Sequence, residues 1–236
     1  MRVVDRVVAV IGGTSGIGCA IAERFLNLGA RVAVAGLDSP ATPPAVAGRA
    51  EVSELDVTDG DGVRRFIGAL PRLDVLVNAA GVIRRSEEFD PVVFARVIEV
   101  NLHGAMRACV AARPLLAESG GCIVNLASML SFFGGPLVPA YTASKGAIMQ
   151  LTKSLAVAWA AEGIRVNAVA PGWIRTPLTA GIRADGAAER RIIERTPMGR
   201  WGEPADVAGA VAFLAGPDAA FITGVVLPVD GGYLAS

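Results

Sequence analysis

The stretch Val7-Val-Ala-Val-Ile11, followed by Gly12-Gly-Thr-Ser-Gly16-Ile-Gly18, decides how the rest of this sequence is interpreted. Its small and β-branched apolar residues predict a buried strand, and the apolar stripe over residues 17–28 predicts a helix directly after the turn. The glycines permit a tight turn, so that N–H groups at the helix N-terminus can face a pyrophosphate. A glycine-rich turn without a ligand is the alternative, but the strand–turn–helix context favours the phosphate site.

Short apolar runs alternate with longer helical patterns along the whole chain. Most of the runs are continuously apolar, which is typical of strands buried on both faces. Alternation of strands and helices implies parallel strands with right-handed crossovers. We therefore expect an α/β fold with a doubly wound, seven-stranded parallel sheet of the Rossmann type, residues 1–236 forming a single domain. The expected strands are 7–11, 31–35, 52–55, 75–78, 122–126, 165–169 and 225–229, and the clearest helices are 17–28, 92–116, 142–161 and 205–215.

Two segments interrupt this alternation. Residues 37–49 hold three prolines and are too short for a full crossover helix, so we expect a loop or a single turn there. Residues 177–202 are charged, partly helical and follow the end of a strand. A segment of this kind is a candidate lid over an active site.

Composition argues against several classes of protein. The chain has 22 basic and 22 acidic residues, so we expect neither a nucleic-acid nor a membrane partner. The N-terminus is charged and too short in its apolar part for a signal peptide. Cys19, Cys109 and Cys122 are scattered, and His103 is the only histidine, which predicts no disulfide framework and no metal site. We expect a soluble, cytoplasmic protein.

One acidic residue is expected about 20 residues after the glycine turn, where it would hold the adenosine ribose hydroxyls of a dinucleotide. Asp38 lies 20 residues after Gly18. No lysine or arginine occupies positions 13–15 or 36–39 to meet a 2′-phosphate, which favours NAD over NADP. Asp38 falls slightly beyond the expected strand end at Gly36, so a solvated loop aspartate is the alternative.

Tyr141 and Lys145 are four residues apart and share one face of an expected helix. A lysine ammonium beside a tyrosine favours the phenolate, which can then take the proton of an alcohol during hydride transfer. Only Lys145 and Lys153 among the 22 basic residues are lysines, so the choice of lysine over arginine at position 145 indicates a specific role. A tyrosine–lysine pair is also common in helices, but Ser128 follows an expected strand at the sheet edge where ligands bind.

These motifs occur together in the order and spacing of a known family. Gly12-x-x-x-Gly16-x-Gly18, Asn78-Ala-Ala-Gly81, Asn101, Ser128, Tyr141-x-x-x-Lys145 and Pro171-Gly172 resemble the short-chain dehydrogenase/reductase family over nearly the whole chain. Ile11 stands where the family usually has threonine, which removes one hydroxyl and leaves the turn intact.

The resemblance implies a nicotinamide-dependent enzyme, a homotetramer or homodimer packed through the helices that end near Ala117 and Ala161. It implies that Asn101, Ser128, Tyr141 and Lys145 form a catalytic tetrad in which Asn101 holds a water for proton relay. Asp56 and Val57 would contact adenine, and Ile174 and Thr176 the carboxamide. The implied cofactor-binding residues are Gly12, Thr14, Ser15, Gly16, Ile17, Gly18, Asp38, Asp56, Val57, Asn78, Ala79, Gly81, Tyr141, Lys145, Pro171, Gly172, Ile174 and Thr176.

Three further stretches, 78–85, 127–133 and 199–202, are similar to 2-deoxy-D-gluconate and 2-dehydro-3-deoxy-D-gluconate dehydrogenases, and less closely to gluconate 5-dehydrogenases. This predicts oxidation of a secondary hydroxyl of a sugar acid, whose carboxylate needs a cationic partner. Solvated loop arginines are the alternative for each candidate. The candidate substrate residues are Arg84, Arg85, Phe133, Arg175 and Arg200.

Two other functions stay open at this stage. An NADP-dependent 3-oxoacyl thioester or cyclic ketone reductase predicts a basic residue near the adenosine ribose, and residues 36–39 lack one. A catalytically silent NAD-binding regulatory protein predicts the loss of one of the four catalytic side chains, and all four are present.

Overall fold

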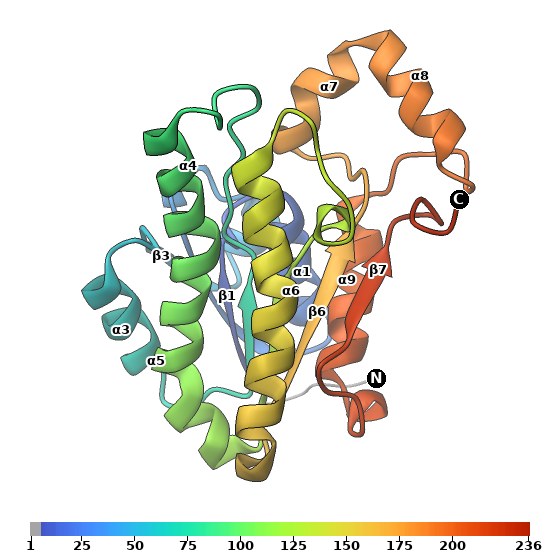
Figure 1. The fold of residues 1–236 in the computed structure, drawn as a ribbon. Coiled ribbons are helices and arrows are strands. Elements are labelled where there is room, and N and C mark those ends of the chain that lie inside the picture. The colour runs from blue at the N-terminus through green and yellow to red at the C-terminus, as the bar shows by residue number, and fades with distance from the viewer. Residues whose placement is uncertain (1–5) are drawn as a thin grey trace.

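The computed structural model describes residues 6–236 and contains a seven-stranded sheet with strand order β3-β2-β1-β4-β5-β6-β7. Every neighbouring pair of strands is parallel, which confirms the predicted doubly wound sheet (Figure 1). The strands are β1 (Val7–Ile11), β2 (Arg31–Gly36), β3 (Glu51–Glu54), β4 (Val75–Asn78), β5 (Cys122–Leu126), β6 (Arg165–Pro171) and β7 (Val226–Val229).

Helices cover both faces of the sheet. Those of the described residues are α1 (Gly16–Asn27), α2 (Pro44–Ala47), α3 (Gly60–Gly68), α4 (Pro91–Ile98), α5 (Gly104–Ser119), α6 (Pro139–Trp159), α7 (Ala180–Ala184), α8 (Gly186–Arg195) and α9 (Pro204–Ala215). In Figure 1, α3, α4, α5 and α6 lie in front of the sheet, and α1 and α9 lie behind it. None of these helices is long and apolar enough to cross a membrane.

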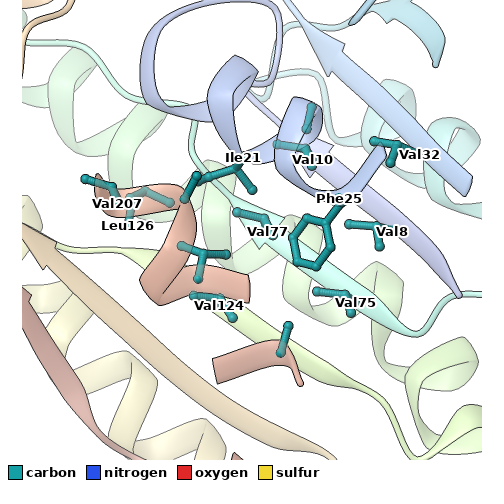
Figure 2. Packing of buried hydrophobic residues seen from close by; sticks show 14 of the residues in the cluster. Val8, Val10, Ile21, Phe25, Val32, Val75, Val77, Val124, Leu126 and Val207 are labelled. Carbon is teal, nitrogen blue, oxygen red and sulfur yellow. The ribbon is translucent and has the colours of Figure 1, made fainter. Parts of the chain in front are cut away.

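The alternation of side chains along each strand divides the core into two layers. Val8 and Val10 of β1 pack on one face with α1 and α9, whereas Ala9 and Ile11 pack on the other face with α3, α5 and α6. Figure 2 shows Phe25 of α1 among the valines of the first layer. Because both faces of the strands are buried, polar groups of the central strands can reach solvent only at the strand ends.

One of the irregular crossovers agrees with the expectations, and two others differ from them. Residues 37–49 form a 3₁₀ turn, Ser39–Ala41, and the four-residue α2, as the prolines predict. The single helix expected over 92–116 is α4 and α5 joined by the π-helical turn Glu99–His103. The sequence analysis missed α3, a nine-residue helix that Asp59 caps by accepting a hydrogen bond from the Asp61 N–H.

The segment proposed as a lid projects beyond the carboxyl ends of the strands. It contains the 3₁₀ turn Pro177–Thr179 followed by α7 and α8, and it stands apart from the two helical layers in Figure 1. Asp185 separates the two helices and caps α8 by accepting hydrogen bonds from the N–H groups of Ala187 and Ala188.

Replacing Phe25 by alanine tests the packing of the first layer. The Phe25 side chain is fully buried between α1 and the sheet, so Phe25→Ala should lower the free energy of unfolding by ~3–5 kcal/mol. Phe221→Ala is the matched control, because Phe221 is fully exposed and its loss should change stability by less than ~0.5 kcal/mol. Denaturant unfolding measures both, and equal effects would contradict the description of this core.

Candidate active site

The glycine turn between β1 and α1 brings two backbone segments into contact. A Cβ on Gly18 would lie 2.1 Å from the carbonyl oxygen of Gly12, so no larger residue fits there. Gly12 has a φ of +82°, and a Cβ on it would lie 2.3 Å from the backbone nitrogen of Ala80. The turn is therefore pressed against the chain that leaves β4, and glycine is required at both positions.

The N-terminus of α1 opens into a groove beside this turn. Ser15 is the N-cap residue but makes no side-chain capping bond, and the first turn contains no acidic residue. The free N–H groups of the first turn form the positive end of the helix, and this end suits a pyrophosphate. The groove has a volume of about 460 Å³, and the implied cofactor residues that line it are Gly12, Thr14, Ser15, Gly16, Ile17, Gly18, Asp56, Val57, Ala79, Gly81 and Thr176.

Other implied cofactor residues lie elsewhere. Asn78 is buried in the sheet, where its amide donates to the Asn125 side chain at 2.9 Å. Gly172 lines a second cavity, whereas Pro171 ends β6 and Ile174 is buried beyond it. A Cβ on Gly172 would lie 2.7 Å from the Asp230 Cβ, so this glycine is needed for packing at the end of β6.

Asp38 is not among the residues that line the groove; Gly36 and Leu37 are. The Asp38 backbone is left-handed, with a φ of +56°, and its N–H donates to the Glu54 carboxylate at 3.0 Å. The Ser39 N–H donates to the other carboxylate oxygen at 2.7 Å, and this bond is the main cause of the lowered pKa of Glu54. Glu54 was not predicted from the sequence, and its ionised carboxylate lies against the backbone of Asp38 and Ser39.

A second cavity, of about 1010 Å³, lies between the carboxyl edge of the sheet and the segment of α7 and α8. Ser128 and Tyr141 line it, together with Arg85 and Leu137. Ile182, Asp185, Arg191 and Arg195 line the opposite side. Polar groups from three widely separated parts of the sequence therefore meet in one space next to the groove.

Ser128 follows β5 and is held by a reciprocal cap. Its hydroxyl accepts a hydrogen bond from the Leu130 N–H at 3.1 Å, and its N–H donates to the Ser131 hydroxyl at 3.3 Å. Ser131 in turn donates to the Lys145 carbonyl at 2.6 Å, which ties this turn to α6. The Ser128 hydroxyl is thereby fixed at a position from which it lowers the pKa of the Tyr141 phenol.

The half-buried Tyr141 and the buried Lys145 form a pair on α6. The Lys145 Nζ lies 5.5 Å from the centre of the Tyr141 ring and donates to the Leu126 carbonyl at 2.6 Å. Burial raises the pKa of Tyr141 to about 12, although the Ser128 hydrogen bond opposes this, and burial lowers the pKa of Lys145 to about 8. Desolvation, which raises the pKa of the phenol, therefore outweighs the lowering that was expected from the lysine ammonium.

Asn101 lies in the π-helical turn between α4 and α5. Its side chain accepts from the Val82 N–H at 2.8 Å and donates to the Val82 carbonyl at 2.9 Å and to the Ser144 hydroxyl at 3.1 Å. A Cβ on Gly81 would lie 3.4 Å from the Asn101 Oδ1 and 3.7 Å from the Lys145 Nζ. Glycine at this position leaves a space that both polar groups face.

The five candidate substrate residues have different locations. Arg85 lines the cavity, whereas Arg84 lines the groove. Arg175 lies 3.1 Å from Glu203, Arg200 lies 2.8 Å from Asp206, and neither lines the cavity. Phe133 also lies outside the lining and stacks on Tyr233 with ring centres 6.2 Å apart. These three were expected in the cavity because the sequence places them near the carboxyl edge of the sheet. Such a pattern indicates the edge at which a residue lies but not the direction of its side chain.

Two arginines of α8 were missed. Arg191 and Arg195 are one helical turn apart and both line the cavity. The Arg195 guanidinium lies 4.2 Å from the centre of the Tyr233 ring. The spacing of four residues within the expected lid was the available signal, but the density of arginines in residues 183–200 concealed it.

Comparisons with known proteins agree with this geometry. A family model described as enoyl-(acyl carrier protein) reductase matches residues 11–234. A 2-dehydro-3-deoxy-D-gluconate 5-dehydrogenase of Bacillus subtilis is 47% identical over 69% of this chain and 65% of its own length. A cis-4-hydroxycyclohexanecarboxylate dehydrogenase of Sinomonas cyclohexanicum is 42% identical over 98% of this chain and 97% of its own length.

A solved structure gives the same result at the level of the fold. The gluconate 5-dehydrogenase of Burkholderia cenocepacia, in complex with NADP and tartrate, is 31% identical. The match has a TM-score of 0.93 and covers 100% of this chain and 97% of that one. With the glycine turn, the parallel sheet and the tyrosine–lysine pair in place, the chain belongs to the short-chain dehydrogenase/reductase family, whose members related to it are oxidoreductases of secondary alcohols and ketones.

Proposed function

We propose that this protein is an NAD(H)-dependent oxidoreductase that interconverts a secondary alcohol and a ketone in a small carboxylic acid, with a deoxy sugar acid as the preferred substrate. The observation that carries the proposal is that Ser128 and Tyr141 line a cavity directly beside the groove at the N-terminus of α1. A reacting carbon in that cavity would lie between the acid–base group and a cofactor held in the groove. The segment 177–202, which contains α7 and α8, would close this space against water as a lid.

Tyr141 is the acid–base group in this proposal. In oxidation it takes the hydroxyl proton of the substrate, and in reduction it returns a proton to the carbonyl oxygen. Ser128 donates a hydrogen bond to the same substrate oxygen and stabilises the charge that develops there. A bound nicotinamide supplies or accepts the hydride, and its oxidised form adds a positive charge that favours the phenolate.

Lys145 and Asn101 would remove the proton from Tyr141. A Cβ on Gly81 would lie in contact with both the Lys145 Nζ and the Asn101 Oδ1, so a water molecule near that position would have two polar partners. A lysine whose pKa burial has lowered to about 8 exchanges protons readily near neutral pH. The proton thus has a path from the buried phenol toward solvent along α6 and the π-helical turn.

The charge of the cavity supports an acidic substrate. Arg85, Arg191 and Arg195 line it together with one carboxylate, Asp185, and none of the three arginines lies within 4.0 Å of a carboxylate of the described residues. Guanidinium groups without an acidic partner suit a substrate carboxylate. The names of both curated relatives describe acids, a deoxygluconate and a cyclohexanecarboxylate. Apolar side chains of Ile83 and Leu137 on the cavity wall also allow a cyclic hydroxy acid as a second candidate.

The choice of NAD over NADP rests on the charge at the ribose end of the groove. Gly36 and Leu37 line that end, and the Glu54 carboxylate is held nearby by the N–H groups of Asp38 and Ser39. Of the two arginines in the lining of the groove, Arg84 and Arg96, Arg96 is paired with Asp56 at 3.3 Å. An additional 2′-phosphate would meet negative charge there. The NADP bound to the Burkholderia relative is the reason to measure both cofactors.

Assembly and location are also part of the proposal. Met106 and Val110 of α5 and Val157 of α6 are exposed apolar side chains, which supports packing of these helices in a homotetramer or homodimer. Cys19, Cys109 and Cys122 are free and buried, which supports a reducing, cytoplasmic location.

Tyr141→Phe tests the assigned chemistry. It removes the phenolic hydroxyl without changing the ring, so turnover of sugar acids should fall by at least ~10²-fold while NAD binding changes little. A panel of sugar acids and cyclic hydroxy acids is followed by nicotinamide absorbance, with NAD and NADP side by side. Tyr233→Phe removes the hydroxyl of another tyrosine that lines the cavity, and it should keep its turnover. Retained turnover in Tyr141→Phe would contradict the mechanism.

The pH dependence of turnover tests the pair. The first proton leaves the two groups near pH 8, the lowered pKa of Lys145. One of the two singly deprotonated forms is the active phenolate–ammonium form, so alcohol oxidation should rise with pH through about 8 and ketone reduction should fall. Profiles of kcat/KM between pH 6 and 10 measure this, and a flat oxidation profile would exclude the pair as the acid–base unit.

The arginines of α8 make a separate prediction. Arg191→Ala and Arg195→Ala should each raise KM for the acid by about tenfold, because each removes a charge-assisted hydrogen bond to the carboxylate. The KM for the corresponding methyl ester should change little. Arg190→Ala, an exposed neighbour that does not line the cavity, is the control. Equal effects on acid and ester would remove these arginines from the carboxylate site.

A further inference from the structure

Glu88 is a fully buried carboxylate outside the set of residues assigned so far. It lies between β4 and α4, and it forms no ion pair with a cation of residues 6–236. Its two oxygens accept hydrogen bonds from two backbone N–H groups, Oε1 from Arg84 at 2.8 Å and Oε2 from Tyr141 at 2.8 Å. A buried carboxylate is costly unless its oxygens are satisfied, so these two bonds explain how it is tolerated.

The bond to Tyr141 caps the catalytic helix from a distant part of the chain. Val138 is the N-cap residue of α6 and provides no side-chain cap. Tyr141 is the third residue of the helix, so its N–H lacks an intrahelical acceptor. Glu88, 53 residues away in sequence, supplies that acceptor and places a negative charge at the positive end of the helix.

The bond to Arg84 holds the wall of the active site. Ile83 and Arg85 line the substrate cavity and Arg84 lines the cofactor groove, so the backbone at Arg84 divides the two spaces. A further bond from the Ser86 N–H to the Leu137 carbonyl, at 2.8 Å, joins the same segment to the chain that enters α6. Residues 83–88 are thus tied to the N-terminus of α6 at two points.

We infer that Glu88 is a positioning residue that holds the wall segment 83–88 against the backbone of Tyr141, and that it thereby sets how tightly the substrate is bound. The inference rests on the proposed function in taking Tyr141 as the acid–base group and the cavity beside it, with Arg85, as the substrate site. Glu88 touches neither the cavity nor the groove, so it acts through Arg85 and Ile83. Loosening the wall removes contacts made equally in the ground and transition states, which raises KM more than it lowers kcat.

Glu88→Gln is the direct test, because it keeps the shape of the side chain and offers only one acceptor oxygen for the two N–H groups. We expect KM for the substrate to rise about tenfold, the effect of one hydrogen bond to a charged group, with kcat changed less than about threefold. Glu87→Gln is the matched control, since Glu87 is exposed and adjacent in sequence. If Glu88→Gln does not fold, Glu88→Asp, which keeps the charge but is one methylene shorter, should show the same split.

A double-mutant cycle with Arg85→Ala distinguishes positioning from general destabilisation. If Glu88 acts through the wall, Glu88→Gln should add less than about twofold to the KM of Arg85→Ala. Effects that multiply, a loss confined to kcat, or wild-type kinetics in Glu88→Gln would each overturn the inference. If Tyr141→Phe turns over the substrate as fast as the wild-type protein does, the proposed function is overturned instead. The two failures are therefore distinguishable.

Discussion

The burial of the central strands on both faces is the constraint on which the rest of the structure depends. Val8, Val10, Ala9 and Ile11 of β1 alternate between two apolar layers, and neither layer tolerates a free charge. Because all seven strands are parallel, their carboxyl ends lie at one edge. Loops that follow these ends meet there, and both the groove and the cavity are found at this edge.

The same burial determines the electrostatics of the site. Desolvation raises the pKa of Tyr141 and lowers that of Lys145, so the charged form of each group is less stable here than in water. Hydrogen bonds hold these groups in place. Ser131 ties the Ser128 turn to α6, and Asn101 holds the chain after Gly81. A site of this kind is preorganised, so little rearrangement is needed when the reaction begins.

The sequence predicted the sheet well because the strands are short, apolar and separated by helical patterns. All seven expected strands are present, with boundaries that differ by at most two residues from those of the structure. The π-helical turn at Asn101 has no apolar period of its own. The helix α3 was missed although Val63, Phe66 and Ile67 have helical spacing, because three apolar residues in a nine-residue helix form a short pattern. The tyrosine, lysine and serine were placed in one site because their spacing specifies a helix face and a strand end. Arg175, Arg200 and Glu88 show the limit, since the partners of a loop side chain depend on distant backbone that no local pattern describes.

In the proposed reaction, a keto acid bound in this cavity receives a hydride from the nicotinamide and a proton from Tyr141. The most direct measurement is reduction of keto acids with NADH deuterated at the nicotinamide C4, followed by mass spectrometry of the alcohol. The account predicts one deuterium on the carbinol carbon with the wild-type protein and no labelled alcohol with Tyr141→Phe. Equal label with and without the Tyr141 hydroxyl, or consumption of the cofactor without label in any product, would contradict it.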